Sequence, residues 1–193
     1  QDLLTETEEG KVFAPQAAYG YWKAAGEGND LVLFDEAGER ELCRFHLPRQ
    51  RKADGLCIAD FFRDIDSEER DVIGLQVVTV GQYAAEVARE WFKQDRYQDY
   101  VCLHGLGVEL AEALAEYVHA KIRAELGFGH EDARTMHELI KQGYRGSRYS
   151  FGYPACPNLK DQEPLLDLLG PKHIGVELSD GWQLHPEQST SAI

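Results

Sequence analysis

The sequence predicts an α+β fold, in which strands come first along the chain and helices follow. Apolar and β-branched runs typical of strands lie before residue 80, and helical spacing of apolar residues begins after it. Strands and helices do not alternate as they do in βαβ units. With 193 residues, of which 43% are hydrophobic and 28% charged, the chain has the size and composition of about one ordinary globular domain.

The strands are predicted in the first 80 residues, after an acidic segment at 1–10 that we interpret as the end of a helix. Two apolar runs at 31–34 and 42–47 flank an Ala-Gly turn and predict a β-hairpin. A further short strand or strand end is expected at 56–60. The run 72–80 is rich in β-branched residues and is the strongest strand signal in the chain.

Helical spacing predicts a helix at 82–93 and a longer one at 99–126, which two glycines end. A third helix is expected at 132–142. A short helix capped by Asp161 follows, because Asp favours the position before a helix. The tail, 174–193, has the character of strands and turns.

The charge of the chain excludes some partners. It has 20 basic and 34 acidic residues, a net charge of −14, so it repels phosphate backbones and we expect no nucleic-acid partner. No run approaches the roughly 18 apolar residues of a membrane span, and the first residues lack a secretory signal. The four cysteines form no Cys-x-x-Cys pair that would indicate a metal site: Cys43, Cys57, Cys102 and Cys156. Reduced thiols in a cytoplasmic protein are predicted, because a disulfide framework normally serves smaller secreted chains.

Motifs of self-contained catalysis are absent from the sequence. It has no dinucleotide-binding glycine motif, P-loop, G-x-S-x-G elbow or H-E-x-x-H motif. His130 and His137 flank a helix start, and His119 is predicted on the exposed side of the long helix, so we interpret them as solvated or satisfied rather than metal ligands. A hydrolase that uses Cys156 as nucleophile is an alternative, against the interpretation of this thiol as a small core residue.

The loop at 144–160 is the segment that looks suited to a ligand. Arg148 offers a planar fork for a carboxylate, and Gly152 allows close backbone approach or a positive φ. Pro154 and Pro157 stiffen the loop, and three aromatic residues offer flat faces for a ring or a small cation: Tyr149, Phe151 and Tyr153. The loop suits a zwitterionic metabolite that carries a base. The alternative is a structural corner with a solvent-facing arginine.

The run from Arg148 to Pro157, with its contiguous Gly-Tyr-Pro-Ala-Cys-Pro, resembles the signature of the activation domain of cobalamin-dependent methionine synthase. Stretches at 15–22, 56–61, 110–119 and 185–192 resemble other parts of that family in the same order. The resemblance covers nearly the whole chain, so we expect residues 1–193 to form one activation domain that binds S-adenosylmethionine. It implies a twisted antiparallel sheet with packed helices and a shallow groove for this ligand.

The resemblance also implies roles for single residues. Arg148 matches the arginine that takes the ligand's carboxylate. Tyr153 and Ala155 match the adjacent ligand-lining loop, which also holds Gly152 and Pro154. Glu112 matches an acidic residue that faces the site from the long helix.

The helical period by itself favours a solvated Glu112, because this residue lies about 200° round the helix from Leu110. Glu112 and Glu116 are nevertheless like charges four residues apart, an arrangement that is mildly destabilising. This cost suggests a local field that serves a sulfonium or a bound corrinoid.

The family's function implies that the chain supports reductive methylation of cob(II)alamin to methylcobalamin, with S-adenosylmethionine as methyl donor. That reaction sustains methyl transfer from methyltetrahydrofolate to homocysteine, so the chain is expected to be part of a methyltransferase without independent turnover. Cobalamin would bind mainly to a neighbouring domain of the same polypeptide, and zinc only in the rest of the full-length enzyme. A separate S-adenosylmethionine-binding subunit for another corrinoid protein is the alternative.

A flavodoxin-like or other reductase is the expected electron donor. A basic patch is either a solvated loop or a docking surface for this acidic partner: Arg44, Arg49, Arg51 and Lys52. Family members also have an opening helical segment with an aspartate for the ligand's amino group, and a closing segment with an aromatic contact. Because the chain begins at Gln1 and aligns between these segments, we expect it to be a fragment that lacks both.

Overall fold

The computed structural model describes residues 2–51 and 53–193, which divide into two compact units. The helical unit draws on residues 1–18, 76–148 and 170–190, and the strand unit on 19–75, 149–169 and 191–193. Arg148 is therefore the last residue of the long helical-unit segment, and Tyr149 begins a segment of the strand unit.

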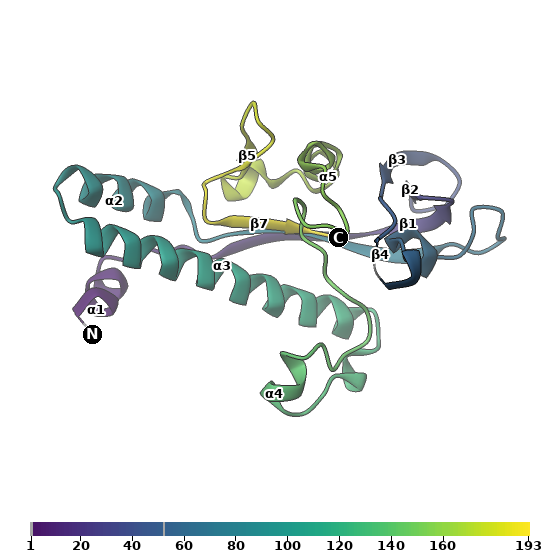
Figure 1. Cartoon of the computed structure of the whole chain (residues 1–193), viewed down its shortest axis with the longest axis horizontal. Coiled ribbons are helices and arrows are strands. Elements are labelled where there is room, and N and C mark those ends of the chain that lie inside the picture. Colours follow the sequence, from purple (N-terminus) through teal and green to yellow (C-terminus); the bar gives the residue numbers. More distant parts are fainter. Residues whose placement is uncertain (1, 52) are drawn as a thin grey trace. The chain divides into compact units, whose positions relative to one another are not determined.

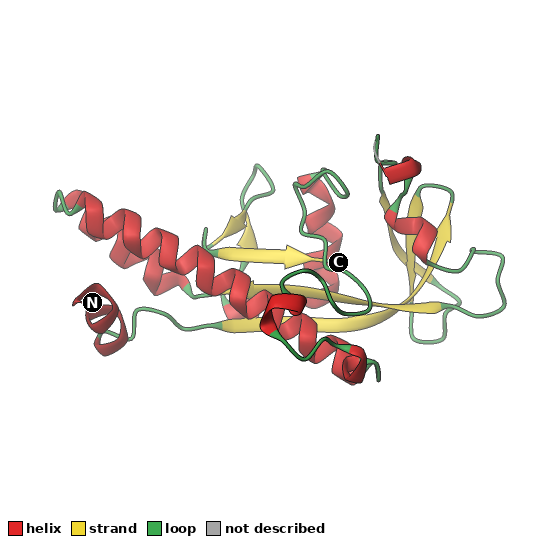
Figure 2. Cartoon of the chain, turned by 60° about the horizontal axis from the view of Figure 1, so that its bottom comes forward, coloured by secondary structure: helices red, strands yellow, loops and turns green. Residues whose placement is uncertain are grey.

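The helical unit is built around two long helices, α2 (Gln82–Lys93) and α3 (Tyr97–Glu125), which lie side by side (Figures 1 and 2). Their facing surfaces bury a hydrophobic core, to which two residues from outside both helices also contribute. Its members are Val12, Val80, Ala84, Ala88, Trp91, Leu103 and Ala111. Small residues on facing helices allow close packing. This core holds α3 in place within the helical unit, and the C-terminal half of α3 carries the helical part of the candidate site.

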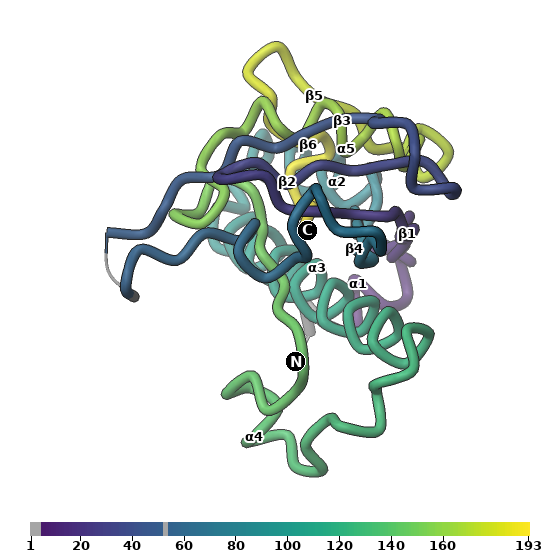
Figure 3. The backbone as a smooth tube through the Cα atoms, turned by 90° about the vertical axis from the view of Figure 1, so that its right-hand side faces the viewer, coloured from purple at the N-terminus to yellow at the C-terminus, as the bar shows by residue number. Residues whose placement is uncertain are grey.

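The remaining elements of the helical unit are short. They are α1 (Asp2–Glu9), α4 (Met136–Leu139), two 3₁₀ helices at Gly129–Glu131 and Pro171–Ile174, and an antiparallel pair of β5 (Glu177–Leu178) and β6 (Leu184–His185). After α3 the chain runs through α4 and then returns toward the helix, as the tube in Figure 3 shows.

The sheet has five strands in the order β3-β2-β1-β4-β7. They are β1 (Gln16–Glu27), β2 (Asp30–Phe34), β3 (Glu41–His46), β4 (Asp71–Thr79) and β7 (Ser189–Ala192), and β1, β4 and β7 each pass from one unit into the other. Both β1–β2 and β2–β3 pair antiparallel. Within the strand unit, β2 is buried on both faces, and Ala25, Val32 and Phe34 form a small core with Ile65.

A segment of 3₁₀ helix packs directly on Gly26 of β1. A Cβ at Gly26 would lie 2.4 Å from the carbonyl oxygen of Ala59, so only glycine fits. The Gly26 N–H donates to Arg63 O at 2.8 Å, and the Ile65 N–H donates to Gly26 O at 2.9 Å. These contacts hold the segment after 57 against the strand.

The strand expected at 56–60 is therefore wrong: this part forms a 3₁₀ helix, Ile58–Phe61. The reason is Asp60, whose carboxylate accepts a hydrogen bond from the Cys57 N–H at 2.9 Å and two from Arg49 at 2.8 Å. An Asp that caps a turn competes with an extended backbone.

The helix expected at 132–142 is also wrong, because only the four residues of α4 are α-helical there. The apolar residues Met136 and Ile140 are exposed, so no buried face supports a longer helix. The chain instead turns at Gln142, with a φ of 60°, and the Gly143 N–H donates to Glu138 O at 2.9 Å.

The other elements confirm the predicted α+β fold with an antiparallel sheet. The first helix, the 31–47 hairpin, the strand at 72–80, both long helices and the helix after Asp161, α5 (Gln162–Leu169), form as expected. The long strand β1 was not predicted from the residue pattern, although the stretch at 15–22 that resembles the family covers its first half. Across 2–51 and 53–193, no helix has both the length and the apolar character that a membrane crossing requires.

Candidate ligand-binding site

The site begins with a polar stripe on α3. Glu112, Glu116, His119 and Arg123 follow each other at steps of four, three and four residues, which places them on one face of the helix. The two glutamate side chains are each 49% exposed, whereas His119 and Arg123 are buried. The stripe thus passes from solvent into the protein along the helix.

Arg148 binds both glutamates of this stripe. Its Nη2 donates to Glu112 Oε2 at 2.8 Å and to Glu116 Oε1 at 3.1 Å, and its Nε donates to Glu116 Oε1 at 3.2 Å. The side chain is 13% exposed, so the alternative of a solvent-facing arginine is wrong. Burial alone would lower the pKa of Arg148, but the bonds and charges of Glu112 and Glu116 outweigh it and raise the pKa. A permanently charged fork therefore lies between two carboxylates.

The prediction that His119 lies on the exposed side of α3 is wrong, since it is 7% exposed. The segment that returns from α4 covers it, and the Tyr144 ring meets the imidazole nearly at right angles, 5.2 Å between centroids. Burial, followed by the charge of Arg123, lowers the pKa of His119 to about 4. His119 is therefore neutral near pH 7.

Arg123 forms the second arginine pair of the stripe. Its Nε and Nη2 donate to the two carboxylate oxygens of Asp132 at 2.9 and 2.6 Å, and its guanidinium lies 4.0 Å from the centroid of the Tyr144 ring. The hydrogen bonds from Arg123 lower the pKa of Asp132. This bidentate pair is of the strong, geometrically specific kind.

The residues after Arg148 form a tight turn in the strand unit. Gly152 has a φ of 91°, its N–H donates to Cys156 O at 2.9 Å, and the Cys156 N–H donates to Tyr153 O at 3.0 Å. The Gln50 amide donates to Pro154 O at 2.8 Å. Tyr153 is 67% exposed at the tip, Pro154 is also exposed and Ala155 is half-buried. The turn is fixed by its backbone and presents Tyr153 to solvent.

The structure thus brings together two sets of the predicted residues. Arg148 and Glu112 form an ion pair within the helical unit, and Gly152, Tyr153, Pro154 and Ala155 share one turn within the strand unit. The expectation that Glu112 is solvated holds for its exposure but not for its charge, which is paired. The residues next to this pair were not predicted from the sequence: Arg123, Asp132 and Tyr144. The helical spacing of 112, 116, 119 and 123 was the available signal.

The thiol of Cys156 does not support a nucleophile. It is buried, it donates to Ser150 O at 3.0 Å, and burial raises its pKa to about 12. All four cysteines are free. In the part of the chain that the structure describes, no three His, Cys, Asp or Glu side chains are grouped to hold a metal ion.

Two residues of the basic patch, Arg44 and Arg49, are paired with carboxylates. Arg44 binds Glu27, Asp30 and Glu41 at 2.8–3.0 Å, and Arg49 binds Asp60. Lys52 lies outside the described residues. The surface therefore offers an acidic partner less positive charge than the sequence suggested.

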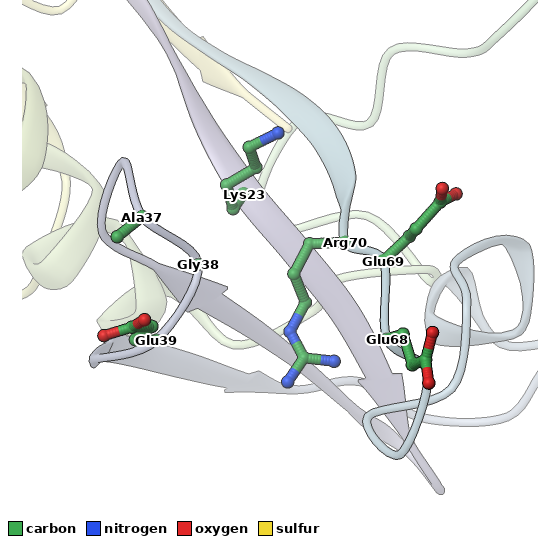
Figure 4. A pocket seen from close by; sticks show the side chains of 7 residues that line it. All are labelled: Lys23, Ala37, Gly38, Glu39, Glu68, Glu69 and Arg70. Carbon is green, nitrogen blue, oxygen red and sulfur yellow. The ribbon is translucent and has the colours of Figure 1, made fainter.

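Two surface cavities lie away from these residues. The larger, about 520 Å³ and shown in Figure 4, lies beside Lys23, Gly38, Glu68 and Arg70 in the strand unit. Arg70 there is already committed, since it donates to Ile65 O at 2.7 Å and lies over a phenylalanine ring. The smaller, about 420 Å³, lies between α2, the start of α3 and the tail of the helical unit. None of the predicted site residues lines either cavity, and we place the site by its chemistry.

Known proteins share this sequence and this fold. A family model described as the vitamin B12 dependent methionine synthase activation domain matches residues 1–193. The methionine synthase of Mycobacterium tuberculosis (strain ATCC 25618 / H37Rv) is 47% identical over 187 residues, and that of Mycobacterium leprae (strain TN) is 45% identical. Each alignment covers 91% of this chain but 16% of the relative, so the chain spans about a sixth of their length.

A solved structure, the MetH reactivation domain bound to AdoHcy, has the same fold with a TM-score of 0.90 and 29% sequence identity. The similarity covers 99% of this chain and 61% of that one. Because the family model matches all 193 residues of this chain, the chain belongs to the activation-domain family of vitamin B12-dependent methionine synthases.

Proposed function

We propose that this chain binds S-adenosylmethionine and supports the reductive methylation of cob(II)alamin to methylcobalamin. The observation that carries the proposal is the Arg148 guanidinium, held charged between two glutamates directly before the Gly-Tyr-Pro-Ala-Cys-Pro turn. The similar MetH reactivation domain was solved with AdoHcy, which is S-adenosylmethionine without its transferable methyl group.

The Arg148–Glu112 pair suits the amino-acid end of this ligand. A carboxylate that approaches Arg148 competes with Glu112 and Glu116 for the same N–H donors. A ligand ammonium can then pair with the released Glu112, which is half exposed. The ligand carboxylate then pairs with Arg148 and the ligand ammonium with Glu112, so the inserted zwitterion adds no unpaired buried charge.

The turn at 152–155 would serve the rest of the ligand. The exposed Tyr153 ring can lie against adenine or near the sulfonium, because aromatic faces attract both rings and cations. The backbone of Gly152, Pro154 and Ala155 is held by the hydrogen bonds of the turn, so the turn itself is preorganised.

In this proposal the chain contributes to catalysis by positioning the methyl donor. Cobalamin, when bound by its own domain and reduced by one electron from a reductase, would supply the nucleophile. The sulfonium of S-adenosylmethionine would supply the methyl group and depart as S-adenosylhomocysteine. This chain's residues need no acid or base for that step. They hold the donor by its amino-acid end and so fix the direction in which the methyl group points.

The remaining activities belong to the proposal for the whole enzyme. Cobalamin would be bound mainly by a neighbouring domain, and the transfer from methyltetrahydrofolate to homocysteine, with its zinc, would lie in the rest of the polypeptide. A flavodoxin-like reductase would supply the electron.

Calorimetric titration with S-adenosylmethionine and S-adenosylhomocysteine tests the binding step, on this chain and on a full-length enzyme that carries it. We expect saturable binding of both ligands and a loss of about 10- to 100-fold in affinity for Arg148→Ala, since hydrogen bonds to a charged group are worth roughly 1.5–3 kcal/mol. The exposed Arg145→Ala is the matched control and should bind as the parent does. No binding by the full-length enzyme, or equal losses in both variants, would refute the proposal.

A further inference from the structure

The segment that carries Arg148 has few buried contacts of its own. Between 133 and 147 most side chains are exposed, including Met136, Ile140 and Lys141, and α4 is a single turn. Such a segment is held in place by the few buried contacts it makes. Its contacts with α3 therefore decide where Arg148 lies.

We call residues 132–148, which leave the end of α3, pass through α4 and come back, the return segment. Its contacts pair in reverse order with those of α3. From the end of α3 backward, Arg123 meets Asp132 and Tyr144, His119 meets Tyr144, and Glu116 and Glu112 meet Arg148. The return segment thus lies antiparallel to α3, with one ion pair at each end and one aromatic ring between them. Figure 3 shows this return from α4 toward the helix.

The arginine of the Arg123–Asp132 pair is more buried than the arginine of the pairs that Arg148 makes with Glu112 and Glu116. The Arg123 side chain is 4% exposed, against 13% for Arg148. Within residues 2–51 and 53–193, His119 Nδ1 and Arg123 Nη1 are buried polar atoms that lack a hydrogen-bond partner. Unsatisfied buried groups cost stability, so a stripe selected for stability alone would be apolar here. The polar atoms of His119 and Arg123 therefore point to a role other than stability alone.

We infer that Arg123, Asp132 and Tyr144 are positioning residues that fix Arg148 for the carboxylate of the ligand. The inference rests on the proposed function for the ligand's identity. None of the three residues needs to touch the ligand. Asp132 fixes the start of the return segment, and Tyr144 fills the space between the imidazole of His119 and the guanidinium of Arg123, four residues before Arg148.

Asp132→Asn tests the inference against a matched control. Glu131→Gln makes the same change of charge one residue away, at an exposed pair with Arg145 whose atoms lie 3.5 Å apart. Two probes are titrated: S-adenosylhomocysteine, which has the amino-acid end, and 5′-deoxy-5′-methylthioadenosine, which has the same adenosine and thioether but no carboxylate. We expect Asp132→Asn to lower the affinity for S-adenosylhomocysteine by about tenfold or more, because the substitution displaces Arg148 alone. The affinity for 5′-deoxy-5′-methylthioadenosine should stay unchanged. Equal losses for both probes, or no loss for either, would overturn the inference.

A second measurement does not depend on any ligand. Hydrogen exchange followed by mass spectrometry should show peptides within 133–148 exchanging at least about tenfold faster in Asp132→Asn, with α2 and the first half of α3 unchanged. Glu131→Gln should exchange as the parent does. If the full-length parent enzyme does not bind S-adenosylhomocysteine, the proposed function fails, and this measurement alone decides the positioning role.

If Asp132→Asn does not fold, Tyr144→Leu is the variant to test. It removes the ring between Arg123 and His119 without a change of charge. It should give the same selective loss and the same faster exchange. Tyr144→Phe keeps the ring and should restore both to the parent's values. Unchanged exchange in Tyr144→Leu would overturn the inference.

Discussion

At the scale of single residues, Arg148 shows how one side chain can be both buried and available. Its charge is maintained by Glu112 and Glu116, which are themselves half exposed. Under the proposed function, a carboxylate ligand would meet a guanidinium that is already oriented and would lose little rotamer entropy on binding. The same geometry explains why an arginine, rather than a lysine, suits this position: its planar fork serves two acceptors at once.

His119 predicts how stability depends on pH. Its pKa falls from the usual 6.5 to about 4 on folding, so the unfolded chain binds more protons between these values and stability falls as pH falls through this range. At pH 5 the loss attributable to His119 should be about 2 kcal/mol relative to pH 7. Urea unfolding at both pH values measures it.

His119→Gln removes the titrating group and should flatten that dependence, whatever it does to stability at pH 7. His137→Gln, at an exposed position of α4, is the control and should keep the parent's slope. A slope in His119→Gln as steep as the parent's would contradict the buried, neutral imidazole described here.

At the scale of elements, the contact between β1 and the 3₁₀ helix predicts an asymmetry between two glycines. Gly26→Ala places a Cβ against the Ala59 carbonyl oxygen and should cost about 3 kcal/mol of unfolding free energy. Gly28→Ala meets no atom within 4 Å and is strained only by its φ of 62°, so about 1 kcal/mol is expected. Thermal and urea unfolding measure both, and equal costs would contradict the close approach at Gly26.

Elements with a strong local signal could be predicted from the sequence. The two long helices and the strand at 72–80 have a clear period, and packing within the structure agrees with it. The 3₁₀ helix at 58–61 could not, because it depends on Asp60 being held by Arg49, eleven residues away. The helix expected at 132–142 failed because its apolar residues find no partner surface.

Part of the candidate site could be predicted because it is local in the sequence. Arg148 and the turn that follows it form one local motif, so their residue types and spacing were visible. The burial of His119 was not, because the periodicity of α3 shows which face is apolar but not which polar face a later segment covers. Only the course of 129–148 places Tyr144 against His119 and Arg123.

At the scale of the whole molecule, the division into two units separates the Arg148 pair from the turn that carries Tyr153. In an enzyme that carries this chain as its activation domain, Arg148→Ala should slow reactivation of the oxidised enzyme by about 10- to 100-fold. Turnover of enzyme already primed with methylcobalamin should stay nearly unchanged, because S-adenosylmethionine takes no part in it. Assays of lag and of primed rate separate the two, and equal loss in both would contradict the assigned role.

The most direct test of the central claim is a crystal structure of this chain with S-adenosylhomocysteine. We predict that the ligand's carboxylate lies within hydrogen-bond distance of the Arg148 guanidinium and that its amino group faces Glu112. A ligand bound elsewhere, with Arg148 still paired only to residues of its own chain, would contradict the account.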